Sequence, residues 1–430
     1  RRRRPPFPPR EQARPGGPTR PVTFSRGAPA TAPFRRRTEL GLIVAAAVLT
    51  ASLYSLASLG RSASLPADVG PFLAVILALF GTAHLAMRFL APDADGTLLP
   101  LAAILNGIGY VFIARLDPDL AALQAVWTAL GVGAFVGTLA LVRRVRDLER
   151  YRYSFALLGV GLLLMPLLPG VGRSIRGARL WVSAGGINFQ PGELAKVALA
   201  VFFAAYLVEK RELLAQATAA ARGRALGPIV LAWGASLLVM TMEKDLGSSL
   251  LFFALFISML WVATGQGTYL AVGAGLFSVG AAFAYSAFGH VQTRVETWLD
   301  PWSRADDQGY QLVQAAYAFG SGGFGGTGPG LGLPGKIPAA TTDFIFAAIG
   351  EELGLLGAAA VLITFVLIVG AGLRIAVRAD QPFEKLLAAG LTTILAVQTF
   401  VIVGGVIRVV PLTGVTLPFM SYGGSSLVAN

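Results

Sequence analysis

The feature that constrains this chain most is a series of apolar segments, each close to the length of a membrane-crossing helix. An α-helix needs about 20 apolar residues to cross the hydrocarbon core of a bilayer. Twelve segments approach this length, the last cut short by the end of the chain, at residues 39–60, 70–91, 97–115, 121–142, 152–169, 190–209, 226–242, 246–264, 268–288, 344–373, 384–410 and from 416 onward. The sequence therefore predicts an all-α, polytopic membrane helix bundle of about 12 transmembrane helices.

Composition supports this class and excludes several kinds of site. Hydrophobic residues make up 55% of the chain and charged residues only 13%, with a mean hydropathy of +0.66, values untypical of a soluble domain. The lack of cysteine excludes disulfides, thiolate metal sites and cysteine nucleophiles. With only His84 and His290, a histidine-rich metal site or a Ser-His triad is also disfavoured.

The net charge of +12 is concentrated at the start of the chain. Eleven of the 35 Lys and Arg residues lie within the first 37 positions, so the excess does not indicate a nucleic-acid partner. Residues 1–38 are rich in Arg, Pro and Gly, which predicts a disordered basic cytoplasmic tail near anionic membrane lipid. Arg35, Arg36 and Arg37 also fit a twin-arginine export signal, but the apolar run that follows is too long for one. Because the chain lacks an initiator Met and stops at Asn430, we expect it to be a fragment of a longer protein.

The distribution of basic residues predicts which side of the membrane each connection faces. Lys and Arg gather in connections on the cytoplasmic side. If the basic tail is inside, so are three further basic connections, at 143–152, 210–225 and 374–385. The same alternation places four connections outside, at 170–189, 243–245, 289–343 and 411–415. The unusual sequence therefore lies on the outer side.

Three consecutive ionisable residues, Glu243, Lys244 and Asp245, separate two apolar segments. Charged groups in such a position are costly unless they lie at the membrane surface or have a function. Asp245 is therefore a candidate catalytic base at the outer face, and Lys244 beside it should favour the ionised carboxylate. Asp is also a good N-cap for the helix expected from Leu246, and the two roles are compatible because a cap fixes the carboxylate in place.

A second group of charges lies in the outer segment that precedes the sixth apolar run. Its three arginines run against the positive-inside trend and suit a pyrophosphate, which guanidinium groups grip bidentately: Arg173, Arg176 and Arg179. Glu193 and Lys196 share one face of a helix that Pro191 begins. They could form only a first-turn ion pair, but an ammonium one turn deep in an apolar span needs a partner or a polar cavity.

The longest outer connection, 289–343, is charged at its start and rich in glycine at its end. It carries Arg294, then Gln311 and Gln314, then the glycine-rich run 320–328. Glycine permits close backbone approach and offers N–H groups to anionic oxygens, and the run lacks the Lys-Ser/Thr ending of a nucleotide P-loop. The connection is either a flexible linker or, given its interleaved aromatic residues, a loop packed onto the membrane domain.

Two further outer stretches flank the last long apolar segments. Asp343 precedes the apolar segment 344–373. Two more acidic residues near the start of that segment, Glu351 and Glu352, are expected near the same outer surface of the membrane. Ser421 and Tyr422 belong to a run of small residues, a pattern that usually marks close helix packing. A packing role and a substrate role are both open for this pair.

Five motifs in one order then make the chain resemble a known family. They are FQPGELAK, KDLGSS, GYQLVQAAYAFGSGGFGG, TDFIFAAIGEELG and LPFMSYGGSS. Over about residues 97–430 the chain resembles the SEDS family of peptidoglycan glycosyltransferases, the RodA/FtsW group, and its extra spans are similar to those of longer actinobacterial-type members. The expected organisation is a disordered tail at 1–38, two additional helices at 39–91 and a catalytic membrane domain at 92–430.

The resemblance implies an activity and a site. The family polymerises lipid II, a disaccharide-pentapeptide on undecaprenyl pyrophosphate, at the outer face of the cytoplasmic membrane. The aspartate of KDLGSS is the family's catalytic residue, here Asp245, and we expect it to deprotonate the acceptor hydroxyl in a single inverting displacement. The expected substrate-binding residues are Glu193, Lys196, Lys244, Arg173, Arg176, Arg179, Arg294, Gln311, Gln314, Asp343, Ser421 and Tyr422. A divalent cation, Mg or Mn, is left open as an aid to pyrophosphate departure.

The resemblance also implies partners and leaves two rival functions. The expected partners are lipid II, the undecaprenyl-pyrophosphate-linked glycan and a class B penicillin-binding protein, which is a transpeptidase. One rival is a lipid II flippase, whose ionisable groups would lie near the membrane midplane. The other is a non-catalytic scaffold, which has no need to keep Glu193, Lys196 and Asp245 together. The sequence does not distinguish an elongation member from a division or sporulation member.

Overall fold

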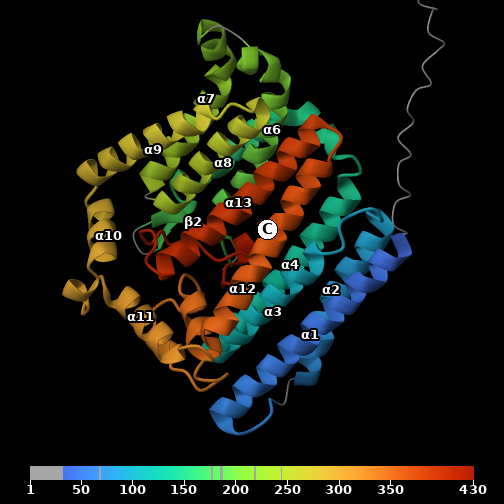
Figure 1. Cartoon of the computed structure of the whole chain (residues 1–430), viewed down its shortest axis with the longest axis vertical. Coiled ribbons are helices and arrows are strands. Elements are labelled where there is room, and N and C mark those ends of the chain that lie inside the picture. The colour runs from blue at the N-terminus through green and yellow to red at the C-terminus, as the bar shows by residue number, and fades with distance from the viewer. Residues whose placement is uncertain (1–31, 67–68, 176–177, 185–186, 217–218, 244) are drawn as a thin grey trace, which may run out of the picture.

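Long apolar helices make up most of the protein, as a computed structural model shows for residues 32–66, 69–175, 178–184, 187–216, 219–243 and 245–430 (Figure 1). Within these residues, nine helices are long and apolar enough to cross a membrane: α1 (Ala32–Ser62), α2 (Val69–Leu90), α3 (Leu98–Leu116), α4 (Pro118–Leu141), α6 (Pro191–Gln216), α8 (Leu246–Thr264), α9 (Thr268–Ala287), α12 (Ile345–Arg378) and α13 (Pro382–Val406). The predicted class, a polytopic all-α membrane bundle, is confirmed. The count of about 12 transmembrane helices stays a prediction.

The other described helices are α5 (Arg152–Leu164), α7 (Ala219–Glu243), α10 (Gly289–Leu299), α11 (Tyr310–Gly322) and α14 (Gly424–Ala429), with 3-10 turns η1 (Val145–Tyr151), η2 (Met165–Leu167), η3 (Trp302–Arg304) and η4 (Pro334–Lys336). α5 is shorter than the predicted span 152–169 because Pro166, in η2, lacks the N–H that would continue the helix. α7 covers the predicted span 226–242. α14 starts later than the span expected from 416, because residues 411–423 are not helical.

α1 extends into the segment that was predicted as a disordered tail. It begins at Ala32, whereas the first span was expected at residue 39. Residues 32–38 are therefore helical, and the rest of the predicted tail, 1–31, lies outside the described residues. The extension has a physical cause in Arg36, a buried residue that anchors the start of the helix.

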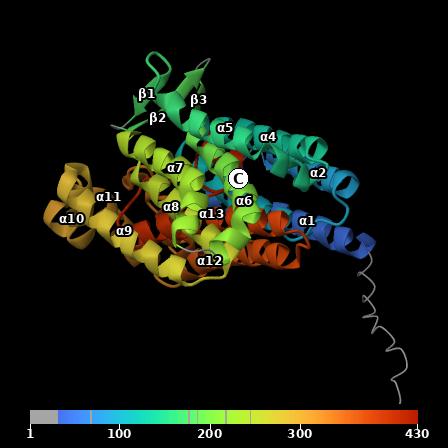
Figure 2. The same ribbon diagram turned by 90° about the horizontal axis from the view of Figure 1, so that it is seen from above.

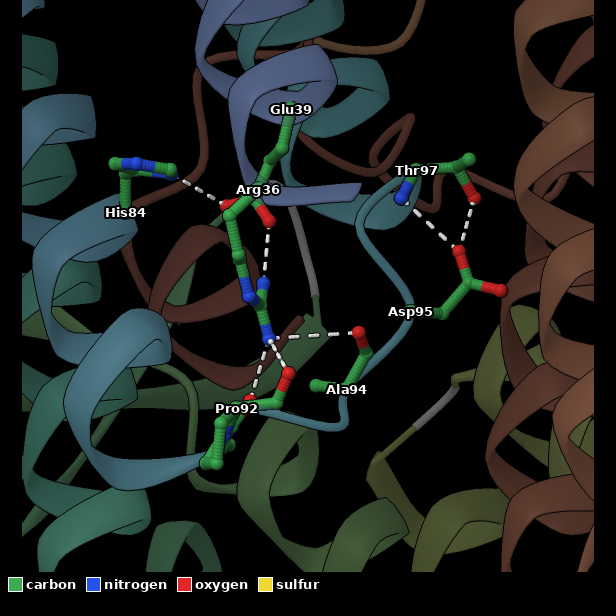
Figure 3. Close-up of polar contacts among 8 residues, drawn as sticks. Arg36, Glu39, His84, Pro92, Ala94, Asp95 and Thr97 are labelled. Atoms are coloured by element: carbon green, nitrogen blue, oxygen red, sulfur yellow. Dashed lines mark hydrogen bonds and ion pairs between the residues drawn. The ribbon is translucent and has the colours of Figure 1, made fainter. Parts of the chain in front are cut away.

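Arg36 belongs to a buried polar cluster that holds α1 against α2 (Figure 3). Its guanidinium pairs with Glu39 and donates to the carbonyl oxygens of Ala91 and Pro92, at 2.5 and 3.1 Å, in the connection between α2 and α3. Glu39 also pairs with Nδ1 of His84 on α2, at 2.8 Å. Because buried polar groups are stable only when paired, this cluster fixes how α1 and α2 meet.

A small antiparallel sheet, which the sequence did not predict, lies beside α5 (Figure 2). Its strands, in the order β1-β2-β3, are β1 (Gly172–Ile175), β2 (Ala178–Ala184) and β3 (Ile187–Phe189). Val182 in β2 pairs with Gly172 on one side and Phe189 on the other. Strands this short give too few residues for an alternating pattern to be distinguished from a loop. β2 packs against α6 and α7, which keeps the sheet attached to the bundle.

α6 lies at the centre of the main core. Its residues 198–207 are all buried, and it packs against α5, α8 and α13. A second core joins α3 and α12 to the non-helical residues 417–420. α1 and α2 lie at one edge of the bundle, and α9 and α10 lie at the opposite edge (Figures 1 and 2). The segment before α14 is thus built into the interior, where it can position side chains.

The connections predicted to share one side of the membrane do lie together. At one end of the bundle, Arg294 in the 289–343 connection donates to the carbonyl oxygen of Thr413 at 3.2 Å. At the other end, Arg374 pairs with Asp95 at 3.1 Å, which joins the 374–385 connection to the one between α2 and α3. The contacts agree with the predicted alternation, and which end faces the outside stays a prediction.

The glycine-rich run packs into a break near the start of α12. Gly354 interrupts that helix with φ 62° and ψ −163°. The Thr327 N–H donates to the Glu351 carbonyl oxygen at 2.9 Å, across the break. A Cβ on Gly326, whose φ is 87°, would lie 2.1 Å from the Glu352 carbonyl oxygen, so only glycine fits there. Of the two interpretations, a loop packed onto the membrane domain is the one observed.

Candidate active site

Asp245 stands at the start of α8 as its N-cap. Its Oδ1 accepts a hydrogen bond from the Ser248 N–H at 2.9 Å, which satisfies a free donor of the first turn. Burial raises the pKa of the Asp245 carboxyl, hydrogen bonds from Ser248 oppose the rise, and Glu193 raises and Lys196 lowers the pKa in turn. The predicted capping role is therefore present. It holds in one orientation a carboxylate that is a stronger base than an exposed one.

Glu193 and Lys196 form a buried ion pair at the start of α6. Both residues are 3% exposed, and the Lys196 Nζ lies 2.8 Å from the Glu193 Oε2. Pro191 begins the helix, so Glu193 lies in its first turn and Lys196 lies one turn deeper, as the spacing predicted. The pair is desolvated, which makes its charges act more strongly on their surroundings than a surface pair would.

A third member of this pair was missed from the sequence. Gln398, on α13, is 0% exposed and its Oε1 accepts a hydrogen bond from the Lys196 Nζ at 3.0 Å. Its Nε2 donates to the Thr416 carbonyl oxygen at 2.9 Å. The signal that could have revealed it is a polar amide within an apolar span, which is costly in a membrane unless it is paired.

Arg294 and Asp343 approach Asp245 from the 289–343 connection. Burial lowers the pKa of Arg294, and the carboxylates of Asp245 and Asp343 raise it, which places all three charges within electrostatic reach of one another. Asp343 lies beside the segment before α14, because a Cβ on Gly414 would lie 3.8 Å from its Oδ2. The same segment borders the first turn of α8, where a Cβ on Gly247 would meet Val415 at 2.2 Å.

The structure thus groups five of the predicted site residues at one end of the bundle, around residues 411–418: Asp245, Glu193, Lys196, Arg294 and Asp343. Three carboxylates and two cations occupy this group. Such a mixture suits a reaction in which one group accepts a proton while charge develops on a leaving phosphate.

Ser421 and Tyr422 make hydrogen bonds that fix the fold of the segment bordering this group. The Ser421 Oγ donates to the Thr342 carbonyl oxygen at 2.6 Å and accepts from the Leu417 N–H at 2.9 Å. The Tyr422 hydroxyl hydrogen-bonds to Trp127 on α4. The packing interpretation of this motif is therefore observed for both residues.

Two of the three predicted arginines, Arg173 and Arg179, lie on the small sheet. Arg173 is exposed and stands opposite Trp181 in the pairing of β1 with β2. Arg179 donates to the carbonyl oxygen of Leu168 at 3.2 Å. Arg176 lies outside the described residues. Among the residues that the structure describes, no hydrogen bond or ion pair joins Arg173 or Arg179 to the group around Asp245.

Three more predicted residues remain without an observed role. Gln311 and Gln314 are half-buried on one face of α11, next to buried Leu312 and Val313. Lys244, expected to favour the ionised form of its neighbour, lies outside the described residues. The substrate-binding role of all three stays a prediction.

The side chains of Glu351 and Glu352 are buried, and the side of the membrane on which they lie stays a prediction. Glu352 pairs with Arg115 on α3 at 2.6 Å and accepts from the Gly330 N–H at 2.9 Å. Glu351 accepts from the Leu333 N–H at 2.8 Å. The sequence predicted that backbone N–H groups of the glycine-rich run would bind anionic oxygens. The N–H groups observed to do so, those of Gly330 and Leu333, follow the run, and the oxygens belong to the protein's own glutamates. Arg115 was missed from the sequence.

Glu243, the last residue of α7, is a further acidic group near Asp245. It is 3% exposed and its Oε1 is buried without a hydrogen-bond partner among the described residues. Burial raises its pKa to about 8, and the Asp245 carboxylate adds to the rise. Glu243 therefore keeps its proton to a higher pH than an exposed glutamate does.

No group of three or more His, Asp or Glu side chains is arranged to hold a metal ion in the part of the chain that the structure describes. A divalent cation bound by protein ligands alone needs several such oxygen donors. The residues present do not form that set, so no step of the reaction is routed through a cation here.

Comparison with known proteins identifies the family. The family model described as "Cell cycle protein", which groups FtsW, RodA and SpoVE, matches residues 110–430. Peptidoglycan glycosyltransferase RodA of Mycobacterium tuberculosis is 44% identical over 415 residues, which cover 93% of this chain and 88% of that protein. Probable peptidoglycan glycosyltransferase FtsW of Geobacter sp. (strain M18) is 36% identical over 270 residues, 62% of this chain and 72% of that protein.

Solved structures of similar fold support the same family assignment. A chain from a study of structural coordination of polymerization and crosslinking by a peptidoglycan synthase complex has a TM-score of 0.66 and 28% identity, and covers 78% of this chain and 94% of its own length. RodA of Thermus thermophilus has a TM-score of 0.57 and 28% identity, with coverages of 80% and 94%. The chain therefore belongs to the FtsW/RodA/SpoVE family, the SEDS group that its five motifs resemble.

Proposed function

We propose that this chain is a peptidoglycan glycosyltransferase that polymerises lipid II with Asp245 as the general base. The single observation that carries the mechanism is the grouping of Asp245 with a buried ion pair and Arg294 at one end of the bundle, in a chain of this family. A base fixed by a helix cap, with two cations in the same group, fits proton removal during attack on a phosphate-bearing sugar.

The proposed reaction is one inverting displacement. The 4-hydroxyl oxygen of the acceptor sugar forms a bond to the anomeric carbon of the donor, while an Asp245 oxygen takes the hydroxyl proton. The bond from the anomeric carbon to the pyrophosphate oxygen breaks, and its electron pair leaves with undecaprenyl pyrophosphate. Lys196 and Arg294 supply positive charge near the developing negative charge. The arginines of the small sheet would add a basic surface at which the pyrophosphate of an incoming lipid can bind.

The site is proposed to face the outside of the cytoplasmic membrane, with the basic N-terminus inside. The support is the positive charge of the connections at the opposite end of the bundle, 143–152, 210–225 and 374–385. The proposed organisation keeps two additional N-terminal helices at 39–91 and a catalytic membrane domain at 92–430.

A transpeptidase of the class B penicillin-binding type is proposed as the partner. The support is the structural similarity to a chain studied in a peptidoglycan synthase complex that coordinates polymerization and crosslinking. Such a partner would cross-link the strands that this chain makes.

The test is the product formed by the purified chain from fluorescently labelled lipid II. Glycan polymer in detergent micelles is the expected result. Translocation of lipid II across vesicle membranes without polymer would instead identify a flippase, and neither product would identify a scaffold. The groups described around Asp245 lie at one end of the bundle rather than at its middle, which favours the enzyme.

A further inference from the structure

A buried glutamine connects three segments of the proposed site. Gln398 lies on α13, between Lys196 on α6 and Thr416 in the segment before α14. Its side chain is 0% exposed. Burying a primary amide within apolar surroundings is unfavourable unless its polar atoms are paired, and here both ends are.

The two contacts require an amide of this length. An ammonium group can only donate hydrogen bonds, and a backbone carbonyl can only accept them. The Gln398 Oε1 must therefore face Lys196, at 3.0 Å, and the Nε2 must face the Thr416 carbonyl oxygen, at 2.9 Å. A carboxylate could not donate to the carbonyl, and a leucine would fill the space but make neither contact.

This bridge sets where the positive charge of Lys196 lies. The ammonium has two described acceptors, the Glu193 Oε2 at 2.8 Å and the Gln398 Oε1. Through Gln398, the ammonium is linked to the backbone at Thr416. Arg294 donates to the carbonyl oxygen of Thr413, three residues earlier in the same segment. Lys196 acts electrostatically on Asp245, so a displaced ammonium changes the environment of that carboxylate.

We propose that Gln398 is a positioning residue for glycosyl transfer, which fixes the Lys196 ammonium relative to Asp245 and to the segment 411–418. The proposal rests on the proposed function, in which Asp245 is the base. The ionisable groups that interact with Asp245 are Glu193 and Lys196 from α6, Glu243 from α7 and Arg294 from α10. Gln398 itself carries no charge and acts through Lys196.

Gln398→Glu and Gln398→Leu test the proposal, with Thr399→Val as the matched control. Thr399 is the next residue on α13, is also buried, and its hydroxyl has no hydrogen-bond partner among the described residues. Valine has nearly its shape, so Thr399→Val should polymerise lipid II at the wild-type rate. Thermal stability in detergent is measured for every variant, so that loss of fold is separated from loss of rate.

Both Gln398 variants should lower the turnover rate at saturating lipid II by at least about tenfold, because both lose the N–H donor that ties the side chain to the Thr416 carbonyl oxygen. Gln398→Leu also removes one of the two acceptors of the Lys196 ammonium. Gln398→Glu adds a negative charge beside Lys196, which offsets the positive charge felt by Asp245. The acid limb of its pH–rate profile should therefore move to higher pH, an effect that loosened packing alone would not produce.

The outcomes separate this proposal from the proposed function. If wild type makes polymer and both folded Gln398 variants match it in rate and in acid limb, Gln398 does not position the site. If Gln398→Glu fails to fold, the rate of Gln398→Leu decides alone, with equality to Thr399→Val overturning the proposal. If wild type itself makes no polymer, the proposed function fails first.

Discussion

The buried ion pair between Glu193 and Lys196 allows a quantitative test of how the site is held together. Lys196→Met keeps most of the side-chain volume but leaves the Glu193 carboxylate, 3% exposed, without its cation. It also removes the donor that Gln398 Oε1 accepts from. Removing one partner of a buried pair costs about 3–5 kcal/mol, and we expect at least this loss of unfolding free energy.

The double variant Glu193→Met with Lys196→Met should be more stable than Lys196→Met alone. Replacing both charges by apolar side chains of similar volume is often neutral, so the remaining cost is the orphaned Gln398 Oε1, about 1–3 kcal/mol. Unfolding of wild type, the two single variants and the double variant in detergent, followed by tryptophan fluorescence, completes the cycle. A double variant as unstable as the sum of the single variants would refute a buried, coupled pair.

Three further predictions concern Glu243, the glycine-rich run and the membrane topology. Burial raises the pKa of Glu243 from about 4.5 in the unfolded chain to about 8 in the folded one, so the stability of wild type falls as the pH rises through this range. Glu243→Gln has no such proton, so its stability relative to wild type should increase over the same range. A stability difference that does not vary with pH would contradict the burial of Glu243. Gly326→Ala, with a φ of 87° and no room for a Cβ, should lose about 2 kcal/mol or more in detergent melting experiments. Gly325→Ala, where a Cβ meets open space, is the control and should melt close to wild type. Because the chain has no cysteine, a membrane-impermeant maleimide on intact cells should label Phe324→Cys and spare Arg144→Cys, and the reverse pattern would invert the topology.

The spans were predictable because their physics is local. A run of apolar residues of the right length specifies a membrane helix by itself. Lys and Arg in the connections predict which side of the membrane each connection faces. Boundaries failed where a distant contact decides them. α1 starts at Ala32 because Arg36 donates hydrogen bonds to the carbonyl oxygens of Ala91 and Pro92. These acceptors are 55 and 56 residues away in the sequence, so the residues near Arg36 do not indicate them.

The small sheet and the break in α12 were missed for a related reason. β1 to β3 are too short for their pattern to be distinguished from a loop, and they are defined by pairing with each other. The break at Gly354 exists because Thr327 and its neighbours supply the backbone hydrogen bonds that the helix gives up. A glycine within an apolar segment does not by itself indicate that a distant loop will supply these hydrogen bonds.

The candidate site was predicted in its charges but not in its connections. Asp245, Glu193 and Lys196 stood out because ionisable groups are expensive next to apolar runs. Arg115, which is partly buried, and Gln398, which is fully buried, did not stand out, because the residues that they pair with lie far away in the sequence. Ser421 and Tyr422 support the segment that borders the site, and their substrate-binding role stays a prediction.

The central claim is that the Asp245 carboxylate removes the acceptor proton, and Asp245→Asn tests it most directly. Asn caps helices about as well as Asp, so the contact with the Ser248 N–H and the stability should be kept while the base is lost. General bases contribute about 10²–10⁴-fold to rate, and the account predicts that folded Asp245→Asn polymerises lipid II at least about 100-fold more slowly than wild type. Polymerisation by the folded variant at the wild-type rate would contradict it.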